Sequence, residues 1–341
     1  MGKGKIFQAL DKIFIQELFR RKKKLFFSST KAEISDVKVE KISPDWAKES
    51  CLTRYEILFS DGAKRNVRGT AIAGKSKKSV WKIMSYLYSR DFSSGDLRIA
   101  RPLDYIENIN LSLYEESPGV TLTEVIRKGS EAIIKQNLKK IARWLTKLHN
   151  VDFEGKKFAK AIFIGLNGYK RIFQEIGKYT PQLKKDFPAP NKLNFINRIW
   201  LREKKLIHND FYTGNSVSDG EIVSGIDFDR VGVGPSLMDV ATFYGALDFP
   251  REILDLGLHK KQSHRFQEFF FRQYCEERGL NQSQTKQHLK KFLVKICLDQ
   301  IYYYAAFTIK GWSLMDWKTK NIFISKIRAL LSKTNQYLDD L

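Results

Sequence analysis

The sequence predicts a two-lobed α/β protein of the α+β type, in which a β-rich lobe over residues 33–116 precedes a larger helical lobe over residues 117–341. Three observations predict this order. Apolar residues alternate with polar ones through much of the first region, Asp61-Gly62 is typical of a hairpin turn between two such runs, and apolar residues recur at helical spacing after Pro118-Gly119. Strands followed by helices are typical of folds that segregate the two.

Residues 1–32 are expected to form a separate N-terminal element. Apolar side chains recur at helical spacing over residues 1–24, and the run Arg20 to Lys24 is basic, so this segment is predicted to be an amphipathic helix with a cationic end. We expect its apolar side to pack on the back of a lobe. The alternative is peripheral contact with a membrane surface.

The β-rich lobe is predicted to contain three strands, a helix and two more strands. The first strand carries Ile34, Val37 and Val39, and the second carries Tyr55, Ile57 and Phe59. The third follows the Asp-Gly turn. The helix is expected over about 75–88 and the last two strands over 99–106 and 109–116.

The second lobe is predicted to be mostly helical. Thr121 and Glu124 have the spacing of a capping box, which marks the start of a helix. A stripe from Ile134 to Leu148 follows at helical spacing. A β-rich insertion is expected over about 205–228, and further helices over 236–248, 262–279, 284–310 and 318–338.

The composition favours a globular, positively charged protein. Hydrophobic residues make up 43% of the chain, and the formal net charge is +22. Such a charge attracts anions in general, including nucleotides, anionic lipid and RNA. Because Lys and Arg are dispersed over most segments instead of forming a stripe with aromatic residues, nucleic-acid binding is disfavoured.

The cysteines indicate a reducing environment. Cys51, Cys275 and Cys297 lie far apart, with no CxxC pair, so neither a disulfide framework nor a zinc site is predicted. No apolar run has the length of a membrane span, and the N-terminus lacks the pattern of a signal peptide. We therefore expect a cytoplasmic protein.

Three oxygen-bearing side chains on neighbouring predicted loops point to phosphoryl transfer. His208 to Asn215 reads H-N-D-F-Y-T-G-N, and a predicted hairpin separates it from Ile226-Asp227-Phe228-Asp229. Phosphoryl transfer needs a carboxylate to position the attacking hydroxyl and hard oxygen ligands for Mg²⁺. Asp210 is the expected catalytic residue, and Asn215 and Asp227 are the expected metal ligands.

Four blocks in this order resemble the aminoglycoside phosphotransferase and choline kinase superfamily. They are Leu113 to Gly119, Trp144 to His149, His208 to Asn215, and Ile226 to Asp229 together with Gly234 to Ala241. The resemblance covers residues 99–245 and implies a bilobal protein-kinase-like fold that binds ATP and Mg²⁺ between its lobes.

The resemblance also implies roles for residues outside the central three. The hinge backbone near Glu115, Glu116 and Ser117 is expected to hold the adenine. His208 and Asp239 are expected to be orienting groups, although Asp239 has the alternative of capping the helix in which it lies. For Asp229 two alternatives stay open, a second Mg²⁺ or an ion pair with Arg230.

The sequence departs from the family pattern in the small lobe. Such proteins place a lysine on the third strand to hold phosphates, paired with a glutamate on the next helix. Alignment puts Thr70 at the lysine position, and Lys82 stands about where the glutamate belongs. We expect Arg68 from the strand or Lys82 from the helix to supply the cation. The stretch from Ser43 to Thr53 has no glycine, so backbone donors or Ser50 would cover the phosphates.

The expected function is an ATP-dependent kinase that phosphorylates a hydroxyl of a sugar, amino alcohol or aminoglycoside. The positive charge favours a neutral or anionic small-molecule acceptor. One alternative is a kinase of a lipopolysaccharide-type saccharide at the membrane surface. Another is a weak or inactive pseudokinase that binds nucleotide, since both members of the usual ion pair are missing.

Overall fold

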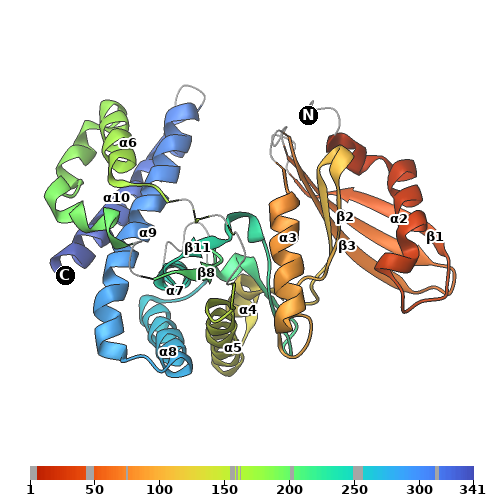
Figure 1. The fold of residues 1–341 in the computed structure, drawn as a ribbon. Helices are drawn as coiled ribbons and strands as arrows, with labels where there is room; N and C mark the ends of the chain where they lie inside the picture. Colours follow the sequence, from red (N-terminus) through yellow and green to blue (C-terminus); the bar gives the residue numbers. More distant parts are fainter. Residues whose placement is uncertain are drawn as a thin grey trace. The chain divides into compact units, whose positions relative to one another are not determined.

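The computed structural model describes residues 6–43, 50–73, 76–153, 158, 160–161, 163–199, 203–248, 256–311 and 315–341. The chain divides into two units (Figure 1). The first unit comprises Met1–Gly119 and Ser224–Asp229, and the second comprises Val120–Val223 and Arg230–Leu341. A short stretch from late in the sequence therefore belongs to the N-terminal unit.

The first unit is built on a five-stranded antiparallel sheet in the order β1-β2-β3-β6-β5. The Asp61-Gly62 hairpin between β2 and β3 is present, and Gly62 takes the left-handed φ of 84° that such a turn favours in glycine. The strands are β1 (Ile34–Lys41), β2 (Ser50–Phe59), β3 (Lys64–Ile72), β5 (Pro102–Ile106) and β6 (Leu111–Glu115).

Helix α2 (Lys12–Phe26), preceded by the 3-10 turn η1 (Phe7–Leu10), covers one face of this sheet (Figure 1). Its apolar side is buried in the core of the unit, where Phe19 contacts Tyr55 edge-on at 5.6 Å between ring centroids. The Tyr55 hydroxyl donates to the backbone oxygen of Ala9 at 2.8 Å. The apolar spacing of the N-terminal segment therefore reflects packing on the sheet.

Helix α3 (Lys78–Leu87) lies on the opposite side of the sheet from α2 (Figure 1). The predicted helix of residues 75–88 continues into a π-helical turn, η2 (Tyr88–Phe92), in which Asp91 is left-handed with φ 64°. The predicted strand of residues 99–106 is split into β4 (Leu97–Ile99) and β5. In β5 the pairing shifts register between Pro102 and Asp104, because proline has no N–H for the ladder.

The second unit is helical, with short strands between its helices. The Thr121 hydroxyl accepts the Glu124 N–H at 3.3 Å, so the N-cap half of the predicted capping box is present, whereas the Glu124 carboxylate pairs with Lys128. Within the unit α5 packs on α8, and α9 packs on α6, α7 and α10. Its helices are α4 (Leu122–Lys128), α5 (Glu131–His149), α6 (Leu166–Tyr179), α7 (Leu237–Ala246), α8 (Lys260–Arg278), α9 (Gln282–Gly311) and α10 (Trp317–Asp339), with 3-10 turns η4 (Pro181–Asp186) and η5 (Pro190–Asn197).

The short strands carry the loops of the predicted site. β8 (Lys205–Ile207) pairs with β11 (Gly232–Gly234), and β7 (Val120–Thr121) pairs with β9 (Ser216–Ser218). The 3-10 turn η7 (Thr213–Asn215) leads into β9. The chain then passes through β10 (Val223–Gly225), which pairs with β4, and enters Ser224–Asp229 of the first unit.

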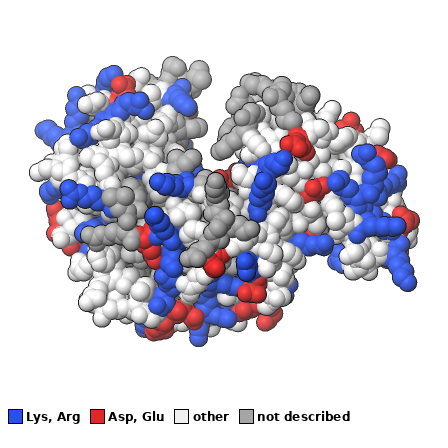
Figure 2. Space-filling model, viewed as in Figure 1, with Lys and Arg blue, Asp and Glu red and all other residues white. Residues whose placement is uncertain are grey.

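Charge is spread over the face of the molecule seen in Figure 2. Figure 2 shows Lys and Arg interspersed with Asp and Glu on the visible faces of both units. Within the described residues, no helix has the length and apolar character needed to cross a membrane.

Candidate active site

The loop that follows β8 is held by a buried carboxylate. Asp239, in the first turn of α7, accepts the backbone N–H groups of His208 and Asn209, each at 2.7 Å. Its Oδ2 also lies 3.1 Å from Nε2 of His149, and Nδ1 of that ring lies 2.9 Å from the Tyr274 hydroxyl. Asp239 therefore does not cap α7, because its carboxylate is directed at the loop.

Aromatic packing against α5 also holds the same loop. Phe211 is buried and stacks on Trp144 of α5, with 4.7 Å between ring centroids and 4° between planes. The His208 ring meets Phe211 edge-on at 5.3 Å and is itself fully buried. With its neighbours on both sides anchored, Asp210 is presented from a loop that has little freedom. Asn209, between His208 and Asp210, takes a left-handed φ of 62° within a bend of the chain.

Asn215 is tied to Asp210 through the backbone. Its Nδ2 donates to the backbone oxygen of Asp210 at 2.9 Å, and its side chain is almost fully buried. Since the amide nitrogen is committed to the loop, Oδ1 is the atom of this side chain suited to a cation. The structure therefore brings Asp210 and Asn215 together in the second unit, as their spacing predicts.

An arginine that follows the I-D-F-D run accompanies Asp210. Nε of Arg230 lies 3.7 Å from Oδ2 of Asp210, and its guanidinium lies over the Tyr303 ring at 5.0 Å. Burial alone would lower the pKa of Arg230, but the negative charge of Asp210 and the contact with Tyr303 raise it above its ordinary value. Arg230 thus stays charged beside the expected catalytic carboxylate.

Asp227 and Asp229 lie in the first unit. Phe228 between them is buried, and both carboxylates are exposed. Asp227 has a left-handed φ of 61°, uncommon for a residue other than glycine and frequent at functional sites. Asp229 forms an ion pair with Lys77, so of its two expected alternatives the Arg230 pair is not the arrangement seen.

Lys77 is the residue that sequence patterns did not single out. Its side chain is only 2% exposed, and its ammonium faces the Asp229 carboxylate. It precedes α3 in a stretch, Lys75 to Lys78, that contains three lysines, and nothing in their spacing shows which one turns inward. What distinguishes Lys77 is its partner Asp229, which lies 152 residues further along the chain and therefore leaves no local pattern.

The two cations expected near the phosphates have different surroundings. Arg68 is bound to Glu116, whose other carboxylate oxygen accepts from Nε of Arg54 at 3.0 Å. Lys82 is exposed on α3 and has no ion pair within the described residues. Thr70, at the position of the family lysine, lies on the same face of β3 as Arg68.

The hydroxyl of Tyr114, on β6, contacts Thr70 and is sensitive to nearby charges. Its hydroxyl lies 3.3 Å from that of Thr70. Burial raises its pKa, and the charges of Asp227 and Asp229 raise it further. Within the first unit, the Tyr114 hydroxyl thus contacts Thr70 and is influenced by the charges of Asp227 and Asp229.

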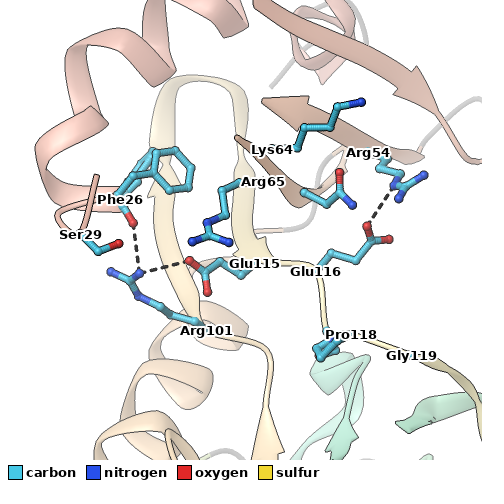
Figure 3. A pocket seen from close by; sticks show the side chains of 13 residues that line it. Phe26, Ser29, Arg54, Lys64, Arg65, Arg101, Glu115, Glu116, Pro118 and Gly119 are labelled. Carbon is cyan, nitrogen blue, oxygen red and sulfur yellow. Dashed lines mark hydrogen bonds and ion pairs between the residues drawn. The ribbon is translucent and has the colours of Figure 1, made fainter. Parts of the chain in front are cut away.

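The expected hinge residues line a cavity of about 560 Å³ in the first unit. Figure 3 shows Glu115, Glu116 and Arg65 bordering it, with Arg101 joining Glu115 to the backbone oxygen of Phe26 through two contacts of 3.1 Å. The Ser117 hydroxyl oxygen is buried with no hydrogen-bond partner among the described residues. An orphaned polar atom of this kind is suited to a ligand.

Two backbone N–H groups of the expected hinge already donate hydrogen bonds within the first unit. Glu115 N–H donates to the Arg101 carbonyl and Glu116 N–H to the Asn66 carbonyl, each at 2.9 Å. A base bound here would therefore be read by Ser117 and by the carbonyls of Glu115 and Glu116. Ser50 begins β2, and the residues just before it, 44–49, lie outside the described part of the chain, so the expected phosphate-covering loop is not described.

The donors present fit Mg²⁺. The described residues contain no group of three or more His, Cys, Asp or Glu able to hold a metal. Mg²⁺ needs no such cage, since it is usually held by one or two carboxylates together with water and substrate phosphates. Asn215 of the second unit offers an amide oxygen, and Asp227 of the first unit offers a carboxylate, each a ligand of the hard type that Mg²⁺ prefers.

Comparison with known proteins identifies the family. A sequence profile of the phosphotransferase enzyme family (APH) matches residues 76–279. The chain belongs to this family. A search of curated proteins found no match.

Solved structures share the fold of this APH chain at low sequence identity. An ethanolamine kinase of Plasmodium vivax aligns with a TM-score of 0.56 and 15% identity over 86% of this chain and 81% of its own. Aminoglycoside phosphotransferase APH(4)-Ia aligns at 0.55 and 16%, over 95% and 98%. Choline kinase LicA from Streptococcus pneumoniae aligns at 0.53 and 12%, over 95% and 99%. The predicted kinase-like α+β fold and the resemblance to this superfamily are confirmed.

Proposed function

We propose that this chain is an ATP-dependent phosphotransferase that phosphorylates a hydroxyl group of a small molecule. The observation that carries the proposal is the fixed loop of the second unit, where Asp239 holds His208 and Asn209 and the Asp210 carbonyl holds Asn215. Membership of a phosphotransferase family supports it.

In this proposal Asp210 positions the acceptor and takes its proton. The acceptor oxygen forms a bond to the γ-phosphorus, the bond from that phosphorus to the β–γ bridging oxygen breaks, and the hydroxyl proton passes to the Asp210 carboxylate. A positioned general base of this kind contributes roughly 10²- to 10⁴-fold to a rate. The ionised carboxylate is the form that accepts a proton, and Nε of Arg230 lies 3.7 Å from Oδ2 of Asp210.

Asn215 and Asp227 would hold the metal. The short β-hairpin of β9 and β10 connects these two residues in the chain. Bound Mg²⁺ would supply neutralisation of the charge on the transferring phosphate. His208, buried against Phe211, and Asp239 would act by fixing the backbone on which Asp210 stands.

The nucleotide would bind on the first unit. The orphaned Ser117 hydroxyl and the carbonyls of Glu115 and Glu116 are suited to the base, and Thr70 with Arg68 or Lys82 to the phosphates. Structures of similar fold were solved with ADP and hygromycin B, and with AMP-PNP and amicoumacin, which supports a nucleotide and a small acceptor here. The net charge of +22 favours a neutral or anionic acceptor over a polycation.

A nucleotide-binding pseudokinase is the second candidate. The observation that favours it is Thr70 in place of the strand lysine, with the nearby Arg68 already bound to Glu116. The two candidates differ in turnover and share nucleotide binding.

The test is ATP consumption over a panel of sugars, amino alcohols and aminoglycosides, with Asp210→Asn measured alongside. We expect at least one acceptor to stimulate ADP release and Asp210→Asn to lower kcat by about 10²-fold or more. Asp339→Asn is the matched control, because it removes an exposed carboxylate that pairs with Lys192 at 3.1 Å. Equal rates for wild type and Asp210→Asn would refute the assignment, and nucleotide binding with no turnover would favour the pseudokinase.

A further inference from the structure

Lys77 is buried in the first unit as one half of an ion pair. The Lys77 side chain is 2% exposed and that of Asp229 is 34% exposed, so the lysine is shielded from solvent while the carboxylate is accessible to it. Taking an ammonium out of water costs several kcal/mol unless a counter-charge offsets it. Because apolar pairs often replace buried ion pairs without loss of stability, stability alone does not explain a lysine here.

The backbone around Lys77 is fixed by Asn110. The Lys77 N–H donates to Asn110 Oδ1 at 3.0 Å, and Asn110 Nδ2 donates to the Ile72 carbonyl at 2.7 Å. The Tyr105 hydroxyl donates to the same Oδ1 at 2.7 Å. Asn110 thereby joins the end of β3 to the start of α3, and it sets the position from which the Lys77 side chain leaves the backbone.

The electrostatics of α3 do not favour a lysine at this position. Lys77 is the N-cap of the helix and makes no side-chain cap. A cation there meets the positive end of the helix dipole, which is unfavourable. A negative group next to the ammonium is required to offset this, and in the structure that group is Asp229.

Asp229 also places the ammonium in the neighbourhood of the expected metal ligand. It lies two residues from Asp227, and the charges of both carboxylates act on the Tyr114 hydroxyl, which lies 3.3 Å from that of Thr70. The family lysine would stand at Thr70. Through Asn110, Lys77 is tied to Ile72, which lies two residues beyond Thr70 on β3, whereas Arg68 is bound to Glu116 and Lys82 is exposed.

We propose that Lys77 is the phosphate-binding cation of this chain, supplied from the start of α3 in place of the strand lysine, with Asp229 as its counter-ion when no nucleotide is bound. The proposal rests on the proposed nucleotide-binding function. The ligand is the polyphosphate of a nucleoside di- or triphosphate, whose oxygens replace or join the Asp229 carboxylate at the ammonium.

The experiment is calorimetric titration of the full chain with ADP, in EDTA and in Mg²⁺. Lys77→Met is expected to weaken ADP binding by about 10- to 100-fold in both conditions, whereas Lys77→Arg retains most of the affinity. Lys78→Met is the matched control, because Lys78 is the neighbouring lysine at the start of α3 and forms an exposed pair with Glu107, and it should change the dissociation constant by less than about twofold. In EDTA, Asp229→Asn should bind ADP at least as tightly as wild type, because it removes the carboxylate that competes for the ammonium.

The double variant Lys77→Met/Asp229→Asn removes both charges and keeps the test informative if the single variant folds poorly. It should weaken ADP binding as Lys77→Met does. A purely structural role predicts a lower melting temperature with an unchanged dissociation constant for the folded protein, and that result overturns the proposal. If wild type binds ADP and Lys77→Met binds it equally, only the role of Lys77 fails. If wild type binds no ADP, the proposed function fails with it.

Discussion

Asp239 accepts the backbone N–H of His208 at 2.7 Å, although the two residues lie 31 positions apart. The same carboxylate accepts the N–H of Asn209 and contacts His149, and it is fully buried. One side chain of α7 therefore satisfies two consecutive amides of the loop immediately before Asp210. The backbone before Asp210 is therefore held by hydrogen bonds within the second unit.

Asp239→Asn is expected to lower stability and turnover together. An amide has one oxygen where the carboxylate has two, so at least one buried N–H loses its acceptor, at a cost of about 1–3 kcal/mol. Urea denaturation measures this loss, and kcat should fall more than the KM for ATP changes. Asp248→Asn is the control, since it removes another carboxylate, just after α7, that pairs with Lys333 away from the loop. An unchanged unfolding free energy in Asp239→Asn would contradict the role given to the carboxylate.

Asn110→Ala is expected to destabilise the first unit by about 2–4 kcal/mol, because it removes the partners of Lys77 N–H, the Ile72 carbonyl and the Tyr105 hydroxyl. Part of the cost comes from the backbone, since Asn110 has a left-handed φ of 54° that alanine tolerates poorly. Asn110→Gly separates the two contributions, as it keeps the φ and loses the hydrogen bonds. Denaturant unfolding followed by fluorescence is the measurement, and equal stability of all three proteins would refute the expectation.

Glu268→Gln is expected to lower the melting temperature at neutral pH but not at low pH. Burial alone would raise the pKa of Glu268, but hydrogen bonds from Lys286 and Tyr244 lower it below its ordinary value of 4.5. A carboxyl whose folded pKa is depressed adds stability above the unfolded pKa, and this stability disappears as the pH falls through the folded pKa.

The difference between wild type and Glu268→Gln should therefore be present at pH 7 and decline as the pH falls below the ordinary value of 4.5. We expect about 1–3 °C at pH 7, because the carboxylate is partly exposed and the pair is screened by solvent. Glu175→Gln, in an exposed pair with Lys178, should show almost no difference at either pH. A difference that grows on acidification would have the wrong sign.

Cys297 is expected to resist alkylation in the native protein. Burial raises the pKa of its thiol to about 12 from an ordinary value of 9.0, so the thiolate at pH 8 is about a thousandfold scarcer than for a free cysteine. Mass spectrometry after iodoacetamide treatment should find Cys297 unmodified in buffer and fully modified in urea. Rapid native labelling at this residue would show that α9 opens.

The elements that the sequence predicts well are those whose cause is local. The Asp61-Gly62 turn, the Thr121 cap and the Ile134–Leu148 stripe each depend on residues within one or two turns of the chain, and each has the expected structure. The sequence does not predict the break between β4 and β5 or the π-helical turn after α3, since apolar spacing indicates an element but not where it is interrupted.

The candidate site divides in the same way. The pairing of Asp210 with Asn215 follows from a fixed spacing within one loop, so the motif predicts it. The inward turn of Lys77 depends on Asp229, which lies 152 residues away, and no local pattern distinguishes Lys77 from the exposed lysine beside it. The binding of Arg68 to Glu116 is likewise a contact across 48 residues.

The return of Ser224–Asp229 to the N-terminal unit has a practical consequence for dissecting the protein. A fragment that stops at Gly119 would carry Lys77 without the carboxylate that faces it, and β4 without the strand beside it. Such a truncation is expected to misfold or aggregate even though its own sheet is complete. Any attempt to express this half alone should graft the later hexapeptide through a linker.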